Sequence, residues 1–345
     1  YVGLPTAVLF ADAGFEVSGF DINTELINSI NNDTYKSEEP NINNLLRKVK
    51  IQKTFSCKNS LKKANIYIIC VPTPKKDNKS DLKAIYDSID LIAEVIENNS
   101  LVIIESTIPI GTTRDCAVKL LNKRDDLDKR KIFFAHCPER VLPGNAINEI
   151  KKNDRVIGGI DKQSTEIASN IYQKFCSGEL VTTSCDTAEM IKLSENTFRD
   201  VNIALANELS LIADNFNINI DDVIHIANRH PRVNIHKPGI GVGGHCIPVD
   251  PYFLIEKQNY KTSIIKTSRE LNLEKEHFIF KKIKNLISQR NKINNIYFYG
   301  LTYKPNINDF RESPAIRILQ MASKLESNKY ICAVDPFLDK EYKKD

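Results

Sequence analysis

The stretch Leu101-Val-Ile-Ile-Glu-Ser-Thr107 decides the fold class, because an uninterrupted apolar run ends directly in polar residues. A short run of this kind is typical of a strand that is covered on both faces. We therefore interpret residues 101–105 as a strand. Comparable strand-like runs recur along the chain at residues 66–71, 132–135, 155–160 and 180–183.

Helical patterns separate these runs, at about 81–98, 113–123 and 165–176. Strands that alternate with helices predict an α/β fold with a doubly wound parallel sheet, whose ligands bind at the carboxyl ends of the strands. The loops that follow the strands therefore hold candidate functional residues, Thr107 and Glu139 among them. As isolated residues, both are also common as helix caps or turn formers.

The first 21 residues have the pattern of a mononucleotide-binding unit. Gly3 opens an apolar helix that runs to Ala13, and the strand at 15–21 ends in Asp21. In a Rossmann unit a third glycine opens the helix, and an acid about 20 residues later binds the ribose. Gly3 and Asp21 fit these two positions. The alternative is that Asp21 caps the next helix.

Composition excludes several classes of function. The chain has 345 residues and a net charge of +4 from scattered lysines, which does not indicate nucleic-acid binding. No run is apolar enough to span a bilayer, and no signal peptide is visible. The eight cysteines form no CxxC pair, so we expect small core residues, Cys70 among them, and a cytoplasmic location.

A long helical pattern at 187–216 begins the second half of the chain and contains Lys192 and Asn196 on one face. A solvated pair is one interpretation, and a pair of donors that stabilises an oxyanion is the other. A second helix follows at 221–228. The helix at 268–288 carries many charges, and we interpret it as a surface helix.

The segment Gly239-Ile-Gly-Val-Gly-Gly-His-Cys-Ile-Pro-Val-Asp250 concentrates four glycines just before Cys246. Glycines permit positive φ and a close approach of the backbone to a ligand, so a thiol at this turn can be exposed. Asp250 follows four residues later. This arrangement indicates a nucleophilic cysteine, and the alternative is a tight turn with an incidental cysteine. His230, His236 and His245 lack metal-ligand spacing, so we assign no metal.

The end of the chain repeats the order seen at its start. A strand at 296–299, a loop, a helix at 314–325 and a strand at 330–334 lead to Asp335. We interpret this as the start of a second nucleotide-type domain. The chain opens without the first Rossmann strand and stops soon after 330–334, so we expect both terminal domains to be incomplete.

These loops together resemble the UDP-glucose/GDP-mannose dehydrogenase family over almost the whole chain. The most specific match is the cysteine loop, supported by Glu105-Ser-Thr107, by the helix with Lys192 and Asn196, and by the segment from Lys304 to Pro314. The resemblance implies an NAD-binding domain at 1–183, a helical domain at 184–290 that makes a homodimer, and the start of a UDP-sugar-binding domain at 291–345.

The resemblance also assigns roles position by position. It implies Cys246 as nucleophile, Lys192 and Asn196 as oxyanion stabilisers, Asp250 beside the thiol, and Thr107 and Glu139 for water and protons. Arg232 would reach the substrate of the neighbouring subunit, and Arg311 would lie near the active site. For the cofactor it implies Tyr1, Val2, Gly3, Asp21, Pro72, Thr73, Thr107 and Arg311. For the sugar nucleotide it implies Glu139, Arg140, Val141, Lys192, Asn196, Arg199, His230, Arg232, Gly243 and Lys304.

Within the family, the segments at 137–144, 153–159, 195–202 and 228–234 are most similar to the branch that oxidises UDP-N-acetyl-D-mannosamine. Two departures separate the chain from the UDP-glucose branch. Val249 stands where that branch has a lysine, and Pro143 stands where it has a second glutamate. The implied product is a UDP-linked uronate, a precursor of surface polysaccharide.

The implied chemistry explains why a cysteine is needed. Oxidation of an alcohol to a carboxylate removes four electrons and therefore uses two NAD molecules. An aldehyde cannot donate a second hydride until a thiolate adds to it, as Cys246 would do. The alternatives are a UDP-N-acetylglucosamine or UDP-glucose dehydrogenase and, as a non-enzyme, a sugar-nucleotide-binding scaffold.

Overall fold

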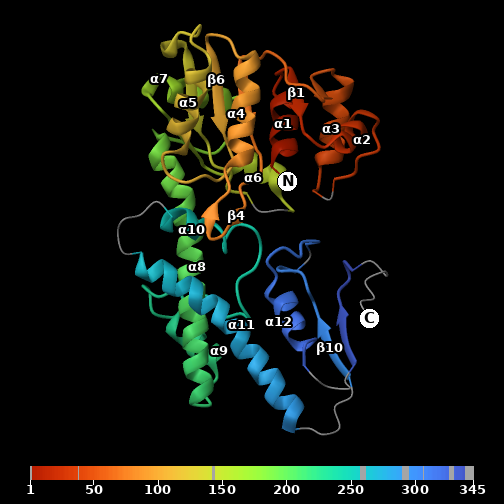
Figure 1. The fold of residues 1–345 in the computed structure, drawn as a ribbon, viewed down its shortest axis with the longest axis vertical. Helices are drawn as coiled ribbons and strands as arrows, with labels where there is room; N and C mark the ends of the chain where they lie inside the picture. The colour runs from red at the N-terminus through yellow and green to blue at the C-terminus, as the bar shows by residue number, and fades with distance from the viewer. Residues whose placement is uncertain are drawn as a thin grey trace. The chain divides into compact units, whose positions relative to one another are not determined.

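The computed structural model describes residues 2–37, 39–141, 144–256, 262–289, 295–305, 307–325 and 330–338. The chain divides into two compact units, Tyr1–Leu193 and Ser194–Asp345, which we describe separately. Figure 1 shows the elements of each unit in chain order by colour. Within the described ranges, every helix is too short or too polar to cross a lipid bilayer.

A five-stranded sheet forms the centre of the first unit, with the strand order β3-β6-β7-β8-β9. The five apolar runs found in the sequence supply all of its strands. Their bounds agree with the predicted ones to within two residues. They are β3 (Ile66–Ile69), β6 (Ser100–Ile104), β7 (Ile132–His136), β8 (Arg155–Gly159) and β9 (Leu180–Ser184).

Helices cover both faces of this sheet, as the doubly wound prediction requires. On β6, Val102 and Ile104 pack with helices α4 (Lys83–Val95) and α5 (Thr112–Lys123). The alternate residues Leu101 and Ile103 pack on the other face. Their partners there are Phe10 of α1 (Gly3–Asp12) and residues of α7 (Lys162–Tyr172). Because successive side chains of a strand point to opposite faces, one apolar run contributes to both cores.

The sheet is not wholly parallel, so that part of the prediction is wrong. Strands β7 and β8 pair antiparallel, with Ala135 opposite Gly159, whereas the other three pairs in the sheet are parallel. An antiparallel neighbour needs no crossover helix over the sheet face. Accordingly, α6 (Ala146–Lys152), which lies between these strands, packs against α1 and its neighbours and not over the sheet.

Several short elements of the first unit were not recognised in the sequence. Helices α2 (Thr24–Asn31) and α3 (Ile42–Ile51) pack with α1 and α6 in a separate apolar cluster. Strand β2 (Phe55–Lys58), also unrecognised, pairs in parallel with β1 (Val17–Phe20), which was predicted at 15–21. A small hairpin and a 3-10 helix complete the set: β4 (Lys75–Lys76), β5 (Lys79–Ser80) and η1 (Lys129–Lys131).

Helices dominate the start of the second unit. The unit boundary falls inside α8 (Cys185–Asn215), which α9 (Ile220–Ala227), α10 (Asp250–Ile255) and α11 (Ser263–Gln289) follow. The surface interpretation of the charged helix is wrong for one of its faces. Arg269, Asn272 and Glu276 of α11 are buried. Buried charges need partners, and these residues find theirs on α8 and α12.

The last elements of the described chain are a strand–helix–strand unit, as predicted. Strands β10 (Asn295–Tyr299) and β11 (Tyr330–Val334) pair in parallel, and α12 (Pro314–Ala322) connects them. The Ser313 side chain caps α12 by accepting from the Ile316 amide, and Pro314 takes the first helical position, where its missing N–H costs nothing.

Candidate active site

The cysteine loop needs glycines because its backbone lies very close to neighbouring residues. Gly241 and Gly244 have φ values of 149° and 89°, which side chains rarely adopt. A Cβ on Gly241 would lie 2.8 Å from Glu276 Oε1, and one on Gly243 would lie 2.7 Å from Tyr303 Cβ. The loop therefore fits between α11 and the residues that follow β10 only because these positions lack side chains.

Cys246 lies at a turn and not in a sealed core. Its side chain is partly exposed, and its carbonyl accepts from the amides of Val249 and Asp250 at 3.0 and 2.9 Å. These bonds lead directly into α10, where Pro251 sits near the helix start. The tight, hydrogen-bonded turn belongs to both interpretations, but the partly exposed thiol at its start is what a nucleophile needs.

Two predicted site residues meet beside this turn. The Asn196 amide nitrogen donates to Asp250 Oδ2 at 2.6 Å, and the two residues are only 7% and 3% exposed. The solvated interpretation is therefore wrong for Asn196. Lys192, half-buried, lies four positions earlier on α8 and belongs to the first unit. The hydrogen bond fixes the orientation of the Asp250 carboxylate at the start of α10, directly after the cysteine turn in the chain.

The start of α1 fits the phosphate groups of a dinucleotide. The helix has no acidic residue in its first turn, and its N-cap Val2 makes no side-chain cap bond. A Cβ on Gly3 would approach the Cys70 Cβ to 3.4 Å, so a small residue suits this position. Uncapped amides at a helix N-terminus favour an anion, which agrees with the predicted role of Gly3.

Asp21 directly follows β1 and is exposed, as a ribose-binding acid requires. Its Oδ1 accepts from the Asn23 amide at 2.8 Å, while the cap of α2 is Asn23, whose side chain accepts from the Leu26 amide. The capping alternative for Asp21 is therefore wrong. Asp21 instead shapes the turn ahead of the cap.

Two predicted cofactor residues from different loops lie together. The Thr73 hydroxyl donates to the Thr107 carbonyl oxygen at 2.7 Å, and both residues are half-buried. Pro72 is exposed beside them. The loops after β3 and β6 thus meet at the carboxyl end of the sheet, as the parallel arrangement of these two strands requires.

The sequence did not identify the partner that holds Glu139. Arg155 donates from Nη1 to Glu105 Oε1 at 3.0 Å and from Nη2 to Glu139 Oε2 at 2.9 Å. Glu105 also accepts from the hydroxyls of Thr6 and Tyr172, at 3.1 and 2.6 Å. A signal was available, because a charged residue at the start of the apolar run 155–160 needs a buried partner.

Burial raises the pKa of the Glu139 carboxyl, although the Arg155 guanidinium beside it favours the charged form and acts in the opposite direction. Burial also raises the pKa of the Cys70 thiol well above its usual value, with Glu105 acting in the same direction. Cys70 therefore remains a thiol, and it is half-buried instead of fully within the core. A carboxyl with a raised pKa is suited to proton transfer.

The remaining predicted substrate residues fall into two groups. Glu139, Arg140 and Val141 line one hollow together with Arg155. Arg199, His230 and Arg232 are exposed in the second unit, where the Arg232 amide donates to His230 Nδ1 at 3.3 Å. Lys304 is half-buried. The structural description does not extend to Tyr1 and Pro143.

Arg311 is held by a carboxylate that the sequence did not single out. Its Nε and Nη2 atoms bind Asp309 at 2.9 and 2.6 Å, and Asp309 Oδ2 lies 3.8 Å from His245 Nδ1. Burial acts to raise the pKa of Asp309, but bonds from Arg311 outweigh it and the pKa is lowered. Among the residues with described side chains, no three metal-binding groups cluster as a metal site would need.

Comparison with known proteins accounts for this arrangement. Residues 1–176 match the NAD binding domain of the UDP-glucose/GDP-mannose dehydrogenase family, residues 186–274 its central domain, and residues 297–345 its UDP binding domain. The chain belongs to this family. It is accordingly an NAD-dependent oxidoreductase that acts on nucleotide sugars, and the predicted family, fold class, enzyme class and cofactor are confirmed.

Two relatives in the family illustrate the degree of similarity. UDP-N-acetyl-D-mannosamine dehydrogenase of Methanocaldococcus jannaschii is 46% identical over 92% of this chain and 74% of its own length. NDP-N-acetyl-D-galactosaminuronic acid dehydrogenase of Ralstonia nicotianae is 43% identical over 93% of this chain and 77% of its own. The chain is thus similar to family members with two different names.

Solved structures of family members have the same fold. The UDP-D-ManNAc dehydrogenase of Pyrococcus horikoshii superimposes with a TM-score of 0.92 at 39% identity, covering 98% of this chain and 82% of that one. A UDP-glucose dehydrogenase of Pyrobaculum islandicum gives 0.84 at 23% identity, covering 96% and 79%. At that identity, the second likeness concerns the fold alone.

Proposed function

We propose that the chain oxidises the C6 hydroxyl of UDP-N-acetyl-D-mannosamine to a carboxylate, which gives UDP-N-acetyl-D-mannosaminuronate for polysaccharide synthesis. The observation that carries this proposal is the buried Asn196–Asp250 hydrogen bond at the start of α10, which directly follows the turn that presents Cys246. The named relatives from Methanocaldococcus jannaschii and Pyrococcus horikoshii support the choice of sugar.

NAD, when bound, accepts the hydride in each of the two oxidations, and the uncapped start of α1 with Gly3 and Asp21 would hold it. In the first oxidation the alcohol loses a hydride from C6 and a proton from its oxygen. Glu139, directly or through water, takes that proton. Burial raises its pKa, so its carboxylate is a better proton acceptor than that of an exposed glutamate.

In the second oxidation the Cys246 thiolate adds to the aldehyde carbon, and the aldehyde oxygen takes a proton to give a thiohemiacetal. This adduct loses a hydride from carbon and the proton from oxygen, which leaves a thioester on Cys246. Lys192 and the Asn196 amide stabilise the oxygen while it carries negative charge. The loss of one such donor typically costs about 100- to 1,000-fold in rate.

Water then cleaves the thioester, which releases the carboxylate and restores the thiol. Glu139, or Asp250 with Thr107, removes the proton of that water. Summed over all steps, one alcohol, two NAD⁺ and one water give one carboxylate, two NADH and three protons. The thioester step distinguishes this enzyme from a simple alcohol dehydrogenase, which needs no cysteine.

The first test counts NADH per sugar with purified enzyme and limiting UDP-N-acetyl-D-mannosamine. We expect two NADH per sugar, measured by the absorbance of NADH, and one NADH would contradict the double oxidation. In Cys246→Ser we expect the reaction to stop after the first hydride or to trap a sugar ester on the serine, visible as added mass. Full turnover in that variant would remove Cys246 from the mechanism.

A second test concerns the sugar. The Ralstonia nicotianae relative favours an N-acetylgalactosamine nucleotide as a second candidate, and the sequence alternatives are UDP-N-acetylglucosamine and UDP-glucose. Comparing kcat/KM for all four nucleotides decides between them, and we expect the mannosamine form to be preferred. Binding of these nucleotides without any NADH would instead favour the scaffold alternative.

We also propose a homodimer in which Arg232 reaches the substrate of the other subunit. Exposed apolar residues on one face of α8 support this, since Phe198, Leu205 and Ile212 are 63, 46 and 51% exposed, and Phe216 just after the helix is 67% exposed. A contiguous apolar surface of this kind marks an interaction site. Sedimentation of the wild type and of a Leu205→Glu variant tests it, with a monomeric variant expected.

The proposed domains are 1–183, 184–290 and 291–345, and the matched family segments support this division. We further propose a cytoplasmic location. Each of the eight cysteines is a free thiol, which suits a reducing compartment.

A further inference from the structure

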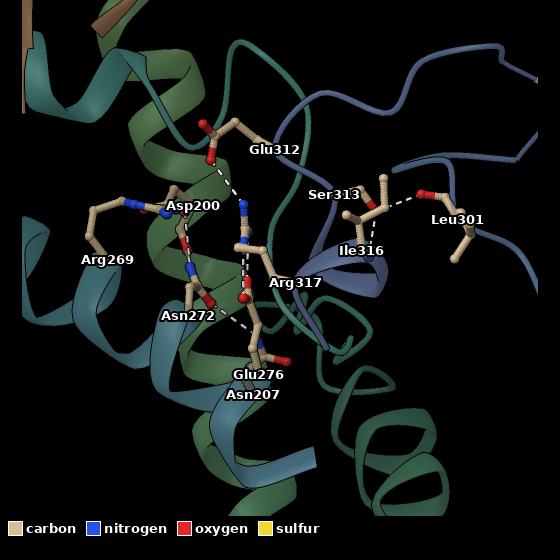
Figure 2. A network of polar contacts seen from close by, with 10 residues as sticks. All are labelled: Asp200, Asn207, Arg269, Asn272, Glu276, Leu301, Glu312, Ser313, Ile316 and Arg317. Atoms are coloured by element: carbon tan, nitrogen blue, oxygen red, sulfur yellow. Dashed lines mark hydrogen bonds and ion pairs between the residues drawn. The ribbon is translucent and has the colours of Figure 1, made fainter. Parts of the chain in front are cut away.

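Four buried polar side chains form a hydrogen-bonded row, called the file below, that links α8 and α11 in the second unit (Figure 2). Asp200 and Asn207 come from α8, and Arg269 and Asn272 come from α11. None of them is more than 2% exposed. Such a group is costly to bury unless its members bind one another, as they do here.

The hydrogen bonds in this file have only one possible direction. Arg269 Nη1 and Asn272 Nδ2 both donate to Asp200 Oδ1, at 2.5 and 2.9 Å. A carboxylate only accepts, so Asn272 must turn its Oδ1 away, where it accepts from Asn207 Nδ2 at 2.9 Å. Asn207 is then left with its own Oδ1 facing outward from the file.

The outward oxygen binds the cysteine loop. Asn207 Oδ1 accepts from the Gly239 amide at 2.8 Å, and Gly239 is the first glycine of the loop. At the other end of the glycine run, the Gly244 amide donates to the Arg311 carbonyl at 3.1 Å. Between these two anchors, Gly241 packs on Glu276, whose carboxylate is held by Arg317 at 2.6 and 2.7 Å (Figure 2).

We infer that Asn207 is a positioning residue for Cys246: it fixes the start of the loop that carries the thiol, in an orientation set by Asn272 and Asp200. Stability alone does not account for the file, because well-packed apolar side chains in place of a buried ionic group are often equally stable or more so. By contrast, Asn207 Oδ1 faces the Gly239 amide in a single orientation only if the hydrogen bonds of the file all run in one direction.

This inference rests on the proposed role of Cys246, so one measurement is chosen that does not involve catalysis. Hydrogen exchange of the full chain reports on the loop peptide that covers residues 240–246. In Asn207→Ala we expect exchange in that peptide to rise about fivefold, the effect of one lost hydrogen bond. Asn202→Ala is the control, because Asn202 is a half-buried asparagine of the same helix whose side chain donates to the Phe198 carbonyl within that helix at 2.7 Å.

The catalytic measurement uses UDP-N-acetyl-D-mannosamine and NAD. We expect Asn207→Ala to lower kcat about 10- to 100-fold, as a displaced reacting group does, with KM changed less than about threefold. Asn202→Ala should keep the wild-type kcat. The inference is wrong if Asn207→Ala raises KM while kcat stays at the wild-type value. It is also wrong if exchange in the loop peptide is unchanged.

A second pair of variants tests the same hydrogen bond without opening a cavity. Gly239→Pro lacks the donor N–H, whereas Gly239→Ala retains it, and an alanine Cβ there meets nothing nearer than the Gly241 oxygen at 3.5 Å. We expect the proline variant to reproduce the Asn207→Ala loss and the alanine variant to lose at most about threefold. Equal losses in both contradict the anchoring role.

The two proposals fail in different ways. If Cys246→Ser keeps full turnover, the proposed function fails whatever the loop peptide shows. If Cys246→Ser is inactive but Asn207→Ala and Gly239→Pro keep the wild-type kcat and exchange rates, the function stands and the positioning role is wrong.

Discussion

Each unit of the chain buries an arginine against a carboxylate, but the two arginines have different surroundings. In the first unit Arg155 binds both Glu105 and Glu139, and its guanidinium lies 4.5 Å from the centre of the Tyr172 ring. In the second unit, among the residues that the structure describes, Arg269 pairs with the single carboxylate of Asp200, which also accepts from Asn272. One arginine joins two carboxylates, and the other begins a file of amides.

The difference lies in where each cluster ends. The Arg155 cluster ends at Glu139, a group that gains and loses a proton, whereas the Arg269 file ends at the Gly239 amide, which does not titrate. A disturbance of the first cluster should therefore change protonation as well as stability. A disturbance of the second should change the position of the cysteine loop.

The largest expected effect is on stability. Arg155→Met leaves Glu105 and Glu139 buried without their cation, and breaking a buried pair typically costs about 3–5 kcal/mol of unfolding free energy. Arg269→Met should cost less, because it leaves one buried carboxylate without its cation instead of two. Urea unfolding of both variants measures the contrast, and equal losses would show that the number of carboxylates does not decide it.

A smaller effect is expected where a neutral group supports the first cluster. Tyr172→Phe removes the hydroxyl that donates to Glu105 at 2.6 Å, and a bond to a charged group contributes about 1.5–3 kcal/mol. The matched control is Tyr67→Phe, whose hydroxyl only accepts from the Ala64 amide, with an expected loss of about 1 kcal/mol. If both losses are the same in urea unfolding, the charge on Glu105 adds nothing to the bond.

The smallest effect is on pH dependence. Burial is the main reason that the pKa of Glu139 is higher in the folded protein than its ordinary value of 4.5. At a pH between the ordinary and the folded pKa, Glu139 is therefore protonated in the folded protein but ionised in the unfolded chain. The unfolding free energy contributed by Glu139 therefore falls as pH rises through that window. Subtracting the curve of Glu139→Gln from that of the wild type isolates this term.

Asp200 provides a second test of this pH dependence. Burial also raises its pKa above 3.8, despite the Arg269 guanidinium beside it. The wild type minus Asp200→Asn should therefore show a fall of the same sign, beginning at a lower pH than for Glu139. A rise with pH in either difference curve would mean that the arginine outweighs burial at that site.

The strands were predictable because their signal is local. An apolar run such as 101–104 can be buried on both faces of a sheet, and no distant residue changes that. The direction of β8 was not predictable, because its antiparallel pairing depends on where α6 packs, which is a contact between distant segments. The burial of α11 was missed for the same reason: Arg269 and Glu276 find their partners on other helices.

The candidate site divides along the same line. The residue types and spacings around Cys246, Lys192, Asn196 and Asp250 were sufficient to predict the family, which is confirmed, and they are the basis of the chemistry that we propose. The hydrogen bond between Asn196 and Asp250 spans 54 positions, and the contact of Arg155 with Glu105 spans 50. No short pattern records pairings at such separations, so Arg155 and Asn207 were not recognised.

The sequence by itself determined the alternation of strands and helices and the glycine-rich turn around Cys246, because both depend on neighbouring residues and their backbone preferences. Only the tertiary structure decided which buried charges meet. Arg155 with two glutamates and Arg269 with one aspartate are similar side chains until folding brings their partners beside them. The low-polarity interior then makes each pairing obligatory, because an unpaired buried charge is too costly to keep.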